Sequence, residues 1–344
     1  MSILSGNLLQ MPIDLLKFPN DLLREVLKLC DPFELYKLSK CSKKRSQKAT
    51  ILRGTKRWKI SYYGGNDMII WTDGPNYRFK QTDNPEDYFK TTRRYGNYMY
   101  IEFPKGGPVE LFVYLLELFG IRTVEFLEPS FGEFDNVSKV AKLSIDRKME
   151  VEAFRIRNIE EVQDVLDFMP LLNQMDITRE FQCSIKFPPE FHFEFVKYPS
   201  QIYIRESSWF TIGQLLDCTC VRIELDNSTF NNRDLDVFLH EWKNAGAFPN
   251  LRVLKIESEK IDNQSPILEM IPPITNVNNP RIEVSINNKF YYHILDGVPV
   301  NKDDGTEGWL KVELGGYSPR LQFLIADPAD TVVEEIPEDD DDDW

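Results

Sequence analysis

Apolar residues recur at helical spacing near the start of the chain, in two short segments that each carry a start signal. In the first, Pro19 stands where a helix can open, because the N–H that proline lacks would be unpaired there. Apolar residues then follow at i, i+1, i+4, i+5 and i+8 and predict one broad stripe: Leu22, Leu23, Val26, Leu27 and Cys30. The second helix is predicted from Asp31 as N-cap, with Pro32 at the first helical position and Glu34 completing a capping box. A unit this short buries little surface by itself, so we expect it to need a partner.

Beyond this helical pair the pattern changes to short β-rich runs and then to one strongly apolar helix. Strands are predicted at 58–63, 68–71, 77–80 and 98–103. The polar stretch 81–94 is predicted to be a loop or poorly ordered. A helix is predicted from 109 to 119, ending at Gly120.

The largest part of the chain then alternates between strand and helix patterns. Strands are predicted at 122–127, 152–156, 173–177, 201–205, 221–225, 252–256 and 281–286, and helices at 159–168, 211–216 and 232–243. Their alternation is typical of parallel strands with helices on one face, as in an irregular βα solenoid of leucine-rich-repeat geometry without the leucine-rich consensus. We therefore expect an α+β or α/β protein whose repeat region is capped at both ends by small β-sheets.

The end of the chain is predicted to close the fold. Strands at 290–294, 309–314 and 320–326 are expected to form a small antiparallel sheet, with a hairpin turn at Asp304-Gly305 joining the first two. From Asp327 onward there are ten acidic residues and no basic ones, which predicts a disordered tail. The expected divisions are an arm (1–11), the helical module (12–57), a β-rich cap (58–107), the repeat region (108–286), the second cap (287–326) and the tail (327–344).

Charge is distributed unevenly along the 344 residues, whose net charge is −14. Residues 1–60 hold 13 Lys and Arg against 5 Asp and Glu (+8), which leaves 28 against 50 (−22) for the rest. An acidic body argues against nucleic acid or an anionic membrane as a partner. Five scattered cysteines suggest free thiols, and the sequence shows neither a signal peptide nor an apolar run of membrane-spanning length. We expect a soluble intracellular protein, cytoplasmic or nuclear.

The helical module resembles the F-box, which docks on the Skp adaptor of cullin-type ubiquitin ligases. The resemblance rests on Phe18-Pro19, on Asp31-Pro32 and on Ser42-Lys43, each in its place in the family pattern. Phe18 stands for the usual Leu and Cys41 for a frequent Val, and both exchanges keep an apolar side chain of tolerable size. The resemblance implies ten adaptor-binding residues: Phe18, Pro19, Leu22, Leu23, Val26, Leu27, Pro32, Phe33, Leu38 and Cys41. We expect them to form a surface that is partly exposed in the lone chain, with some of them holding the two helices together.

The repeat region resembles the type 2 F-box-associated domain, which occurs downstream of an F-box. The matching residues are Ser208-Trp209-Phe210-Thr211-Ile212, the run Asp234-Leu235-Asp236-Val237-Phe238-Leu239 before Trp242, and Phe248-Pro249-Asn250-Leu251. Asp236 replaces the usual Asn, a surface exchange. Together the two resemblances cover residues 12–325.

Candidate chemistry is sparse. His192, His240 and His293 lie about 50 residues apart, and no His/Cys cluster has metal-ligand spacing. Cys218-x-Cys220 is better explained as two small apolar residues beside a strand, and the aromatic residues around Trp209 as core rather than as a ligand cage. The acidic tail lacks the spacing of a calcium loop. No phosphate loop or nucleophile motif is present in the sequence, so we expect no enzyme, no cofactor and no metal site.

Two functions remain open. In the first, the chain is the substrate receptor of a Skp–cullin–F-box ligase, with an unidentified target protein on its repeat region. In the second, it is a protein-binding scaffold that engages the adaptor without cullin-dependent degradation. The target is expected on the strand face of the repeat region, at Arg205, Arg222, Glu224 and Asp226, with both arginines exposed. The loops after these strands are expected to supply the rim: Glu206, Ser207, Asn227 and Ser228.

Overall fold

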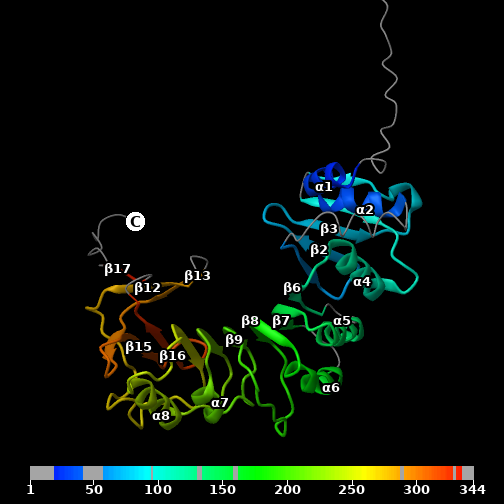
Figure 1. The fold of residues 1–344 in the computed structure, drawn as a ribbon. Coiled ribbons are helices and arrows are strands. Elements are labelled where there is room, and N and C mark those ends of the chain that lie inside the picture. Colours follow the sequence, from blue (N-terminus) through cyan, green and yellow to red (C-terminus); the bar gives the residue numbers. More distant parts are fainter. Residues whose placement is uncertain are drawn as a thin grey trace, which may run out of the picture. The chain divides into compact units, whose positions relative to one another are not determined.

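The structure of this chain is a computed structural model that describes residues 19–41, 57–93, 96–129, 134–157, 162–286, 290–327 and 331–334. Two compact units can be distinguished (Figure 1). The first comprises Met1–Ser61 with Asn66–Thr123, and the second comprises Tyr62–Gly65 with Val124–Trp344. The expected arm 1–11 and the far end of the acidic tail lie outside the described residues.

The first unit joins the predicted helical pair to the β-rich segment and to the apolar helix. Its elements are α1 (Asn20–Leu29), α2 (Pro32–Cys41), β1 (Lys59–Tyr62), β2 (Asp67–Trp71), β3 (Tyr77–Gln81), the 3₁₀ turn η2 (Pro85–Asp87), β4 (Thr91–Thr92), β5 (Asn97–Ile101) and α4 (Gly107–Phe119). The strands lie in the order β1-β2-β3-β5-β4, with β3 and β5 parallel. Gly120 ends α4 in the left-handed region (φ 62°), as predicted. The prediction of a loop over 81–94 was wrong for η2 and β4, because Thr91 and Thr92 pair with β5.

The second unit contains the alternating segment and the chain's end. Its first elements are β6 (Thr123–Leu127), α5 (Phe134–Asp146), β7 (Glu150–Ile156), α6 (Val162–Leu172), β8 (Asp176–Cys183), β9 (Gln201–Ile204), α7 (Ile212–Asp217), β10 (Arg222–Leu225), α8 (Asn232–Lys243) and β11 (Val253–Glu257). These are followed by β12 (Arg281–Ile286), β13 (Phe290–Ile294), β14 (Val298–Asn301), β15 (Glu307–Glu313), β16 (Arg320–Ile325) and β17 (Thr331–Glu334). The strands of its large sheet lie in the order β14-β15-β16-β11-β10-β9-β8-β7-β6, and β7 through β11 pair in parallel.

One face of this sheet is apolar and carries the helices. Neighbouring strands place one apolar residue each in a continuous row across it: Phe154, Phe181, Ile202, Ile223, Leu254 and Phe323. Helix α6 packs on this row through Phe168, whose ring lies 5.3 Å from that of Phe154. Helix α8 packs on the same row through Trp242, 4.7 Å from Phe323. The helices therefore cover one side of the sheet (Figure 1), and alternation leaves polar side chains on the other side.

The carboxyl-terminal strands are arranged differently from the prediction. Strand β12 was expected to be the last repeat strand, but it pairs antiparallel with β13 and β17 in a separate three-stranded sheet. Its alternating Ile282 and Val284 need an apolar partner surface, and they pack with Val253, Trp309 and Leu324 of the large sheet. Val253 pairs in register with Arg222, and both lie on the side of the sheet opposite the apolar row that contains Ile223 and Leu254. The small sheet therefore covers part of the side opposite the helices and does not form a terminal cap.

Three further expectations need correction. The Asp304-Gly305 turn joins β14 to β15, and β15 and β16 extend the large sheet at β11. Helix α5 was not predicted, and β8 begins at Asp176, three residues later than expected. The segment from Asp327 was predicted to be disordered, but Thr331–Glu334 form strand β17. They are ordered because they pair with β12.

Candidate functional site

The two amino-terminal helices are fixed by local capping. Helix α2 begins with a reciprocal capping box, in which the Glu34 N–H donates to Asp31 Oδ1 (2.8 Å) and the Asp31 N–H donates to Glu34 Oε2 (2.9 Å). Pro32 occupies the first helical position, as predicted. Pro19 precedes α1 as its N-cap, and its carbonyl accepts the Leu23 N–H at 2.9 Å. The geometry follows from start signals that are readable in the sequence.

Helix α2 is built into the core of the first unit. The ring of Phe33 lies 5.1 Å from that of Tyr77 and 5.3 Å from that of Phe79, in both cases edge to face. Tyr36 is buried against Phe79 and Tyr114, and burial raises its pKa far above the ordinary value. These contacts mean that the helical module is part of a larger mixed domain, so its apolar residues serve two purposes.

Burial separates the expected adaptor-binding residues into two groups. Leu23, Leu27, Pro32 and Phe33 lie in the interior, where they hold the unit together instead of facing a partner. Exposed or half-buried apolar residues form a single row along α1 at i, i+3, i+7 and i+10: Pro19, Leu22 (49% exposed), Val26 and Leu29 (86%). Leu38 is half-buried, whereas Phe18 and the side chain of Cys41 lie outside the described residues.

Sequence reasoning missed Leu29, the most exposed member of this row. The signal was available, because Leu29 stands seven residues after Leu22 and therefore on the same side of the helix. We call Pro19, Leu22, Val26 and Leu29 the α1 row.

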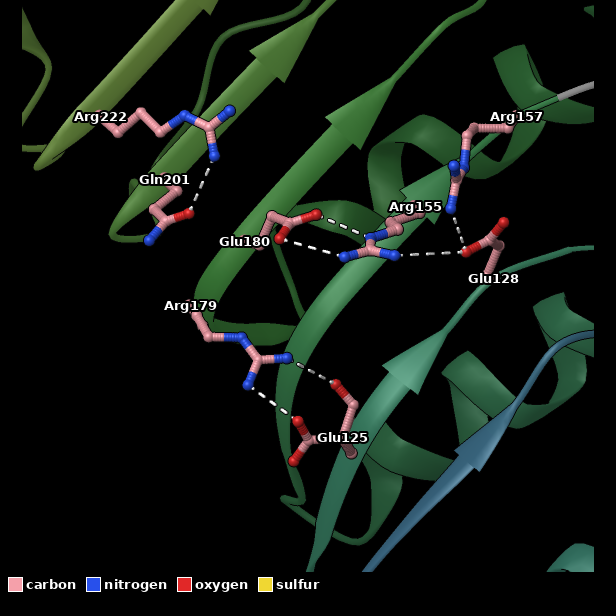
Figure 2. A network of polar contacts seen from close by, with 8 residues as sticks. All are labelled: Glu125, Glu128, Arg155, Arg157, Arg179, Glu180, Gln201 and Arg222. Atoms are coloured by element: carbon pink, nitrogen blue, oxygen red, sulfur yellow. Dashed lines mark hydrogen bonds and ion pairs between the residues drawn. The ribbon is translucent and has the colours of Figure 1, made fainter. Parts of the chain in front are cut away.

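The second candidate surface is the side of the large sheet opposite the helices, which we call the strand face. Arg155 on β7 donates to Glu180 on β8 from Nε (2.7 Å) and from Nη2 (3.2 Å), as Figure 2 shows. Its Nη1 also lies 3.9 Å from Glu128, which accepts a bond from Arg157 at 2.8 Å. Such forked pairs fix the orientation of both partners.

Arg179 forms a second centre of this network. Its Nη1 lies 2.9 Å from Glu125 on β6 (Figure 2). The same atom lies 2.7 Å from Glu152 on β7, so three strands meet at one guanidinium. The guanidinium groups of Arg155 and Arg179 lie 4.6 Å and 5.0 Å from the ring centre of Phe126. The network joins β6, β7 and β8 across the strand face.

A hollow of about 310 Å³ lies beside this network. It is lined by Arg155, Glu180, Gln182, Gln201, Ile202, Tyr203, Arg222 and Glu224. Tyr292 of the small sheet stands next to it, with Arg222 at 4.9 Å and Lys255 at 5.0 Å from its ring centre. The uncovered part of the strand face is thus bordered on one side by the small sheet.

The expected target-binding residues all project toward the strand face, but they are not equally accessible. Arg205 is exposed, as predicted. Arg222 was expected to be exposed, but its side chain is only 19% accessible, because it lies under Tyr292 and donates to Glu224 Oε1 at 2.8 Å. Asp226 accepts a hydrogen bond from the Tyr203 hydroxyl at 3.0 Å. Burial raises the pKa of Asp226 above its ordinary value, and burial together with Asp226 raises the pKa of Tyr203 to about 12.

The expected rim is also divided. Glu206 and Asn227 are accessible and are joined by a hydrogen bond of 3.1 Å. Ser207 and Ser228 are buried, because their hydroxyls donate to the carbonyls of Asp226 and Glu257. These two serines stabilise the turns instead of lining a surface.

The described residues that could carry chemistry are structural in their surroundings. No three His, Cys, Asp or Glu side chains there are grouped so that they could hold a metal ion. Cys218 and Cys220 are buried free thiols with sulfur atoms 3.1 Å apart, which agrees with their interpretation as small apolar residues. Trp209 is buried among Phe187, Phe191 and neighbouring rings, as core aromatics are. In the part of the chain that the structure describes, no helix is both long and apolar enough to cross a membrane.

The α1 row is an exposed apolar surface, and the strand face is a surface of fixed charges. Family models match two parts of the chain, one that contains the α1 row and one that contains the part of the strand face on β9 to β11. Residues 8–44 match the F-box domain, and residues 190–256 match the F-box associated domain, a narrower span than the expected 12–325. The chain thus contains a match to the F-box and, downstream of it, a match to the type 2 F-box-associated domain. F-box domains bind Skp-type adaptors in Skp–cullin–F-box complexes, F-box-associated domains bind substrates, and neither match indicates a catalytic family. No curated protein and no solved structure matched the chain in these comparisons.

Proposed function

We propose that this chain is the substrate-recognition subunit of a cullin-type E3 ubiquitin ligase complex. The α1 row docks on a Skp-family adaptor, and the second unit binds a target protein through its strand face. The ligase chemistry belongs to the partners, and this chain contributes proximity. Its place of action is the cytoplasm or the nucleus, where such complexes would meet their targets.

The α1 row is the observation that carries the proposal. Leu22 and Leu29 expose apolar surface on one side of a helix that lies within the matched F-box, while Leu23 and Leu27 are buried on the other side. An amphipathic helix with apolar residues on both sides has one side committed to its own fold and one side left for a partner.

We further propose that β6 through β11 form an irregular leucine-rich-repeat-like solenoid. The support is that β7 to β11 are parallel neighbours in chain order, with helices on a single face. In such an array the helix-free face is continuous, which suits it to hold another protein.

The decisive experiment replaces Leu22 and Leu29 together by Ala and measures binding to a purified Skp-family adaptor by calorimetry. Two exposed anchors of an interface are expected to contribute about 1–2 kcal/mol each, so affinity should fall by at least about thirtyfold. The urea midpoint should not change, because both side chains are exposed. Val237→Ala is the matched control, since Val237 is also an exposed apolar residue on a helix (45%) but lies in α8.

Unchanged adaptor affinity of the double variant would refute docking through the α1 row. Co-purification of the wild-type chain with the adaptor and a cullin supports the ligase subunit. Recovery of the adaptor without a cullin would favour the adaptor-bound scaffold instead.

A further inference from the structure

The ion pairs on the strand face differ in a regular way in the solvent exposure of their two partners. In each pair described along β6 to β11, including those with Glu128 and Arg157, the cation is more accessible than the carboxylate. The exposed fractions of the side chains are 23% for Arg155 against 13% for Glu180, 31% for Arg179 against 13% for Glu125, and 30% for Lys255 against 14% for Glu224. The pairs Arg157–Glu128 and Arg222–Glu224 have the same order.

This order is not a general property of the second unit. On helix α5 the pair is reversed, with Lys139 less exposed (55%) than Asp135 (78%). On β15, farther along the same side of the sheet, Lys311 (13%) is likewise less exposed than Glu313 (30%). The part of the strand face from β6 to β11 therefore presents cations outermost over recessed carboxylates, although residues 61–344 carry a net charge of −22.

From this charge arrangement we infer that the strand face binds an acidic, extended peptide segment of the target protein through its carboxylates. The inference rests on the proposed function, since it assigns a chemical class to the target of that same face. An approaching carboxylate meets the guanidinium and ammonium groups first, while the recessed carboxylates of the protein are already neutralised. Arg155 donates two hydrogen bonds to Glu180, and a guanidinium has five N–H donors, so its fork can serve a second carboxylate.

The dimensions and the borders of the site favour an extended segment. A hollow of about 310 Å³ accommodates side chains but no folded domain. Tyr292 stands over Arg222 and Lys255 at about the same distance (4.9 and 5.0 Å), so its ring keeps the two cations at the edge of the hollow.

The test measures binding of a short fluorescein-labelled peptide with glutamate at every second position, by anisotropy, to the full-length chain. The matched probe has glutamine in place of every glutamate. We expect the glutamate peptide to bind at least about tenfold more tightly, and its affinity to fall when salt is raised from about 50 to about 300 mM.

The diagnostic variant replaces Lys255 and Arg205 by Gln. Both side chains lie on the strand face, and Glu224 keeps Arg222 as its partner when Lys255 is lost. The control variant replaces Lys139 and Lys142 on α5, which makes the same change in net charge on the helix-covered side. We expect about a fivefold to tenfold loss of affinity in the first variant and none in the second.

Equal binding of the two peptides, or equal losses in the two variants, would overturn the inference. So would preference for a phosphoserine peptide of the same spacing, or for single-stranded RNA, over the glutamate peptide. The titration is repeated with Asp339–Asp343 replaced by Asn, so that the acidic end of the chain cannot compete, and binding in either form supports the inference. If the Lys255/Arg205 variant loses a natural target while the glutamate peptide does not bind, the proposed function stands and the acidic class is wrong.

Discussion

The ion pair between Arg155 and Glu180 gives the sharpest test of whether the strand face is preorganised. Two N–H···O bonds of 2.7 and 3.2 Å join side chains of adjacent strands, and both side chains are less than one quarter exposed. We consider Arg155→Met, which keeps the length of the side chain, and Glu180→Gln, which keeps its shape. The two single variants and the double variant form a thermodynamic cycle.

The expected magnitudes follow from burial. A pair about 4 Å apart at an effective dielectric constant of about 20 has a gross attraction of about 4 kcal/mol, which desolvation largely offsets. Arg155→Met removes both hydrogen bonds to the carboxylate of Glu180, which is mostly buried. We therefore expect a loss of about 2 kcal/mol in the free energy of unfolding, below the range for fully buried pairs. Glu180→Gln should cost about 1 kcal/mol, because Glu128 remains 3.9 Å from Arg155. The double variant should lose about 1.5 kcal/mol, so the coupling energy is also about 1.5 kcal/mol.

Urea denaturation of the four proteins at low and high salt measures these quantities. A partly buried pair is screened less than a surface pair, so we expect most of the coupling to persist in high salt. If the double variant loses the sum of the two single losses, the pair is not coupled. The strand face would then be an ordinary solvated surface without fixed charges.

Two further predictions concern the second unit. Gly308→Ala should lower the free energy of unfolding by about 2–3 kcal/mol, because its Cβ would lie 2.5 Å from Cζ of Phe323. Gly315→Ala, with no neighbouring atom within 4 Å, should change it by less than about 1 kcal/mol, and equal urea midpoints for the two variants would contradict the packing argument. For Asp226, burial raises the folded pKa, so the native state binds the proton more tightly and its stability falls as pH rises from about 4 through that pKa. Asp226→Asn should therefore gain stability relative to the wild type between pH 4 and pH 7 in urea titrations, and a constant difference would refute this.

The elements that the sequence predicted well are those with local signals. Helix α8 begins and ends where it was predicted, because Asn231 and Asp234 cap it reciprocally. Helix α2 likewise begins where it was predicted, with Asp31 and Glu34 as its capping pair. Helix α5 was missed, because its segment 134–146 has no proline or capping signal comparable with these.

The sheet that β12 joins could not be predicted from its local sequence pattern. Its alternation of Ile282, Glu283 and Val284 is correct for a half-buried strand, so the segment was identified as a strand. Which sheet it joins depends on the strand face, where the register places Val253, Leu324 and Trp309 next to the polar rows. Burial of this apolar patch is favourable, and the small sheet buries it by packing Ile282 and Val284 against it.

The same limit applies to the candidate sites. Strict alternation would put Arg179 on the same side as the buried Ile177 and Phe181. Its contacts with Glu152 and with Glu125, 54 residues away, require the register shift that the structure has between β7 and β8. Whether the cation or the carboxylate is outermost depends further on the neighbouring ring of Phe126, on which the guanidinium lies. Local sequence therefore identifies most strand residues, whereas the long-range register determines which charged residues lie on the strand face and which of them are outermost.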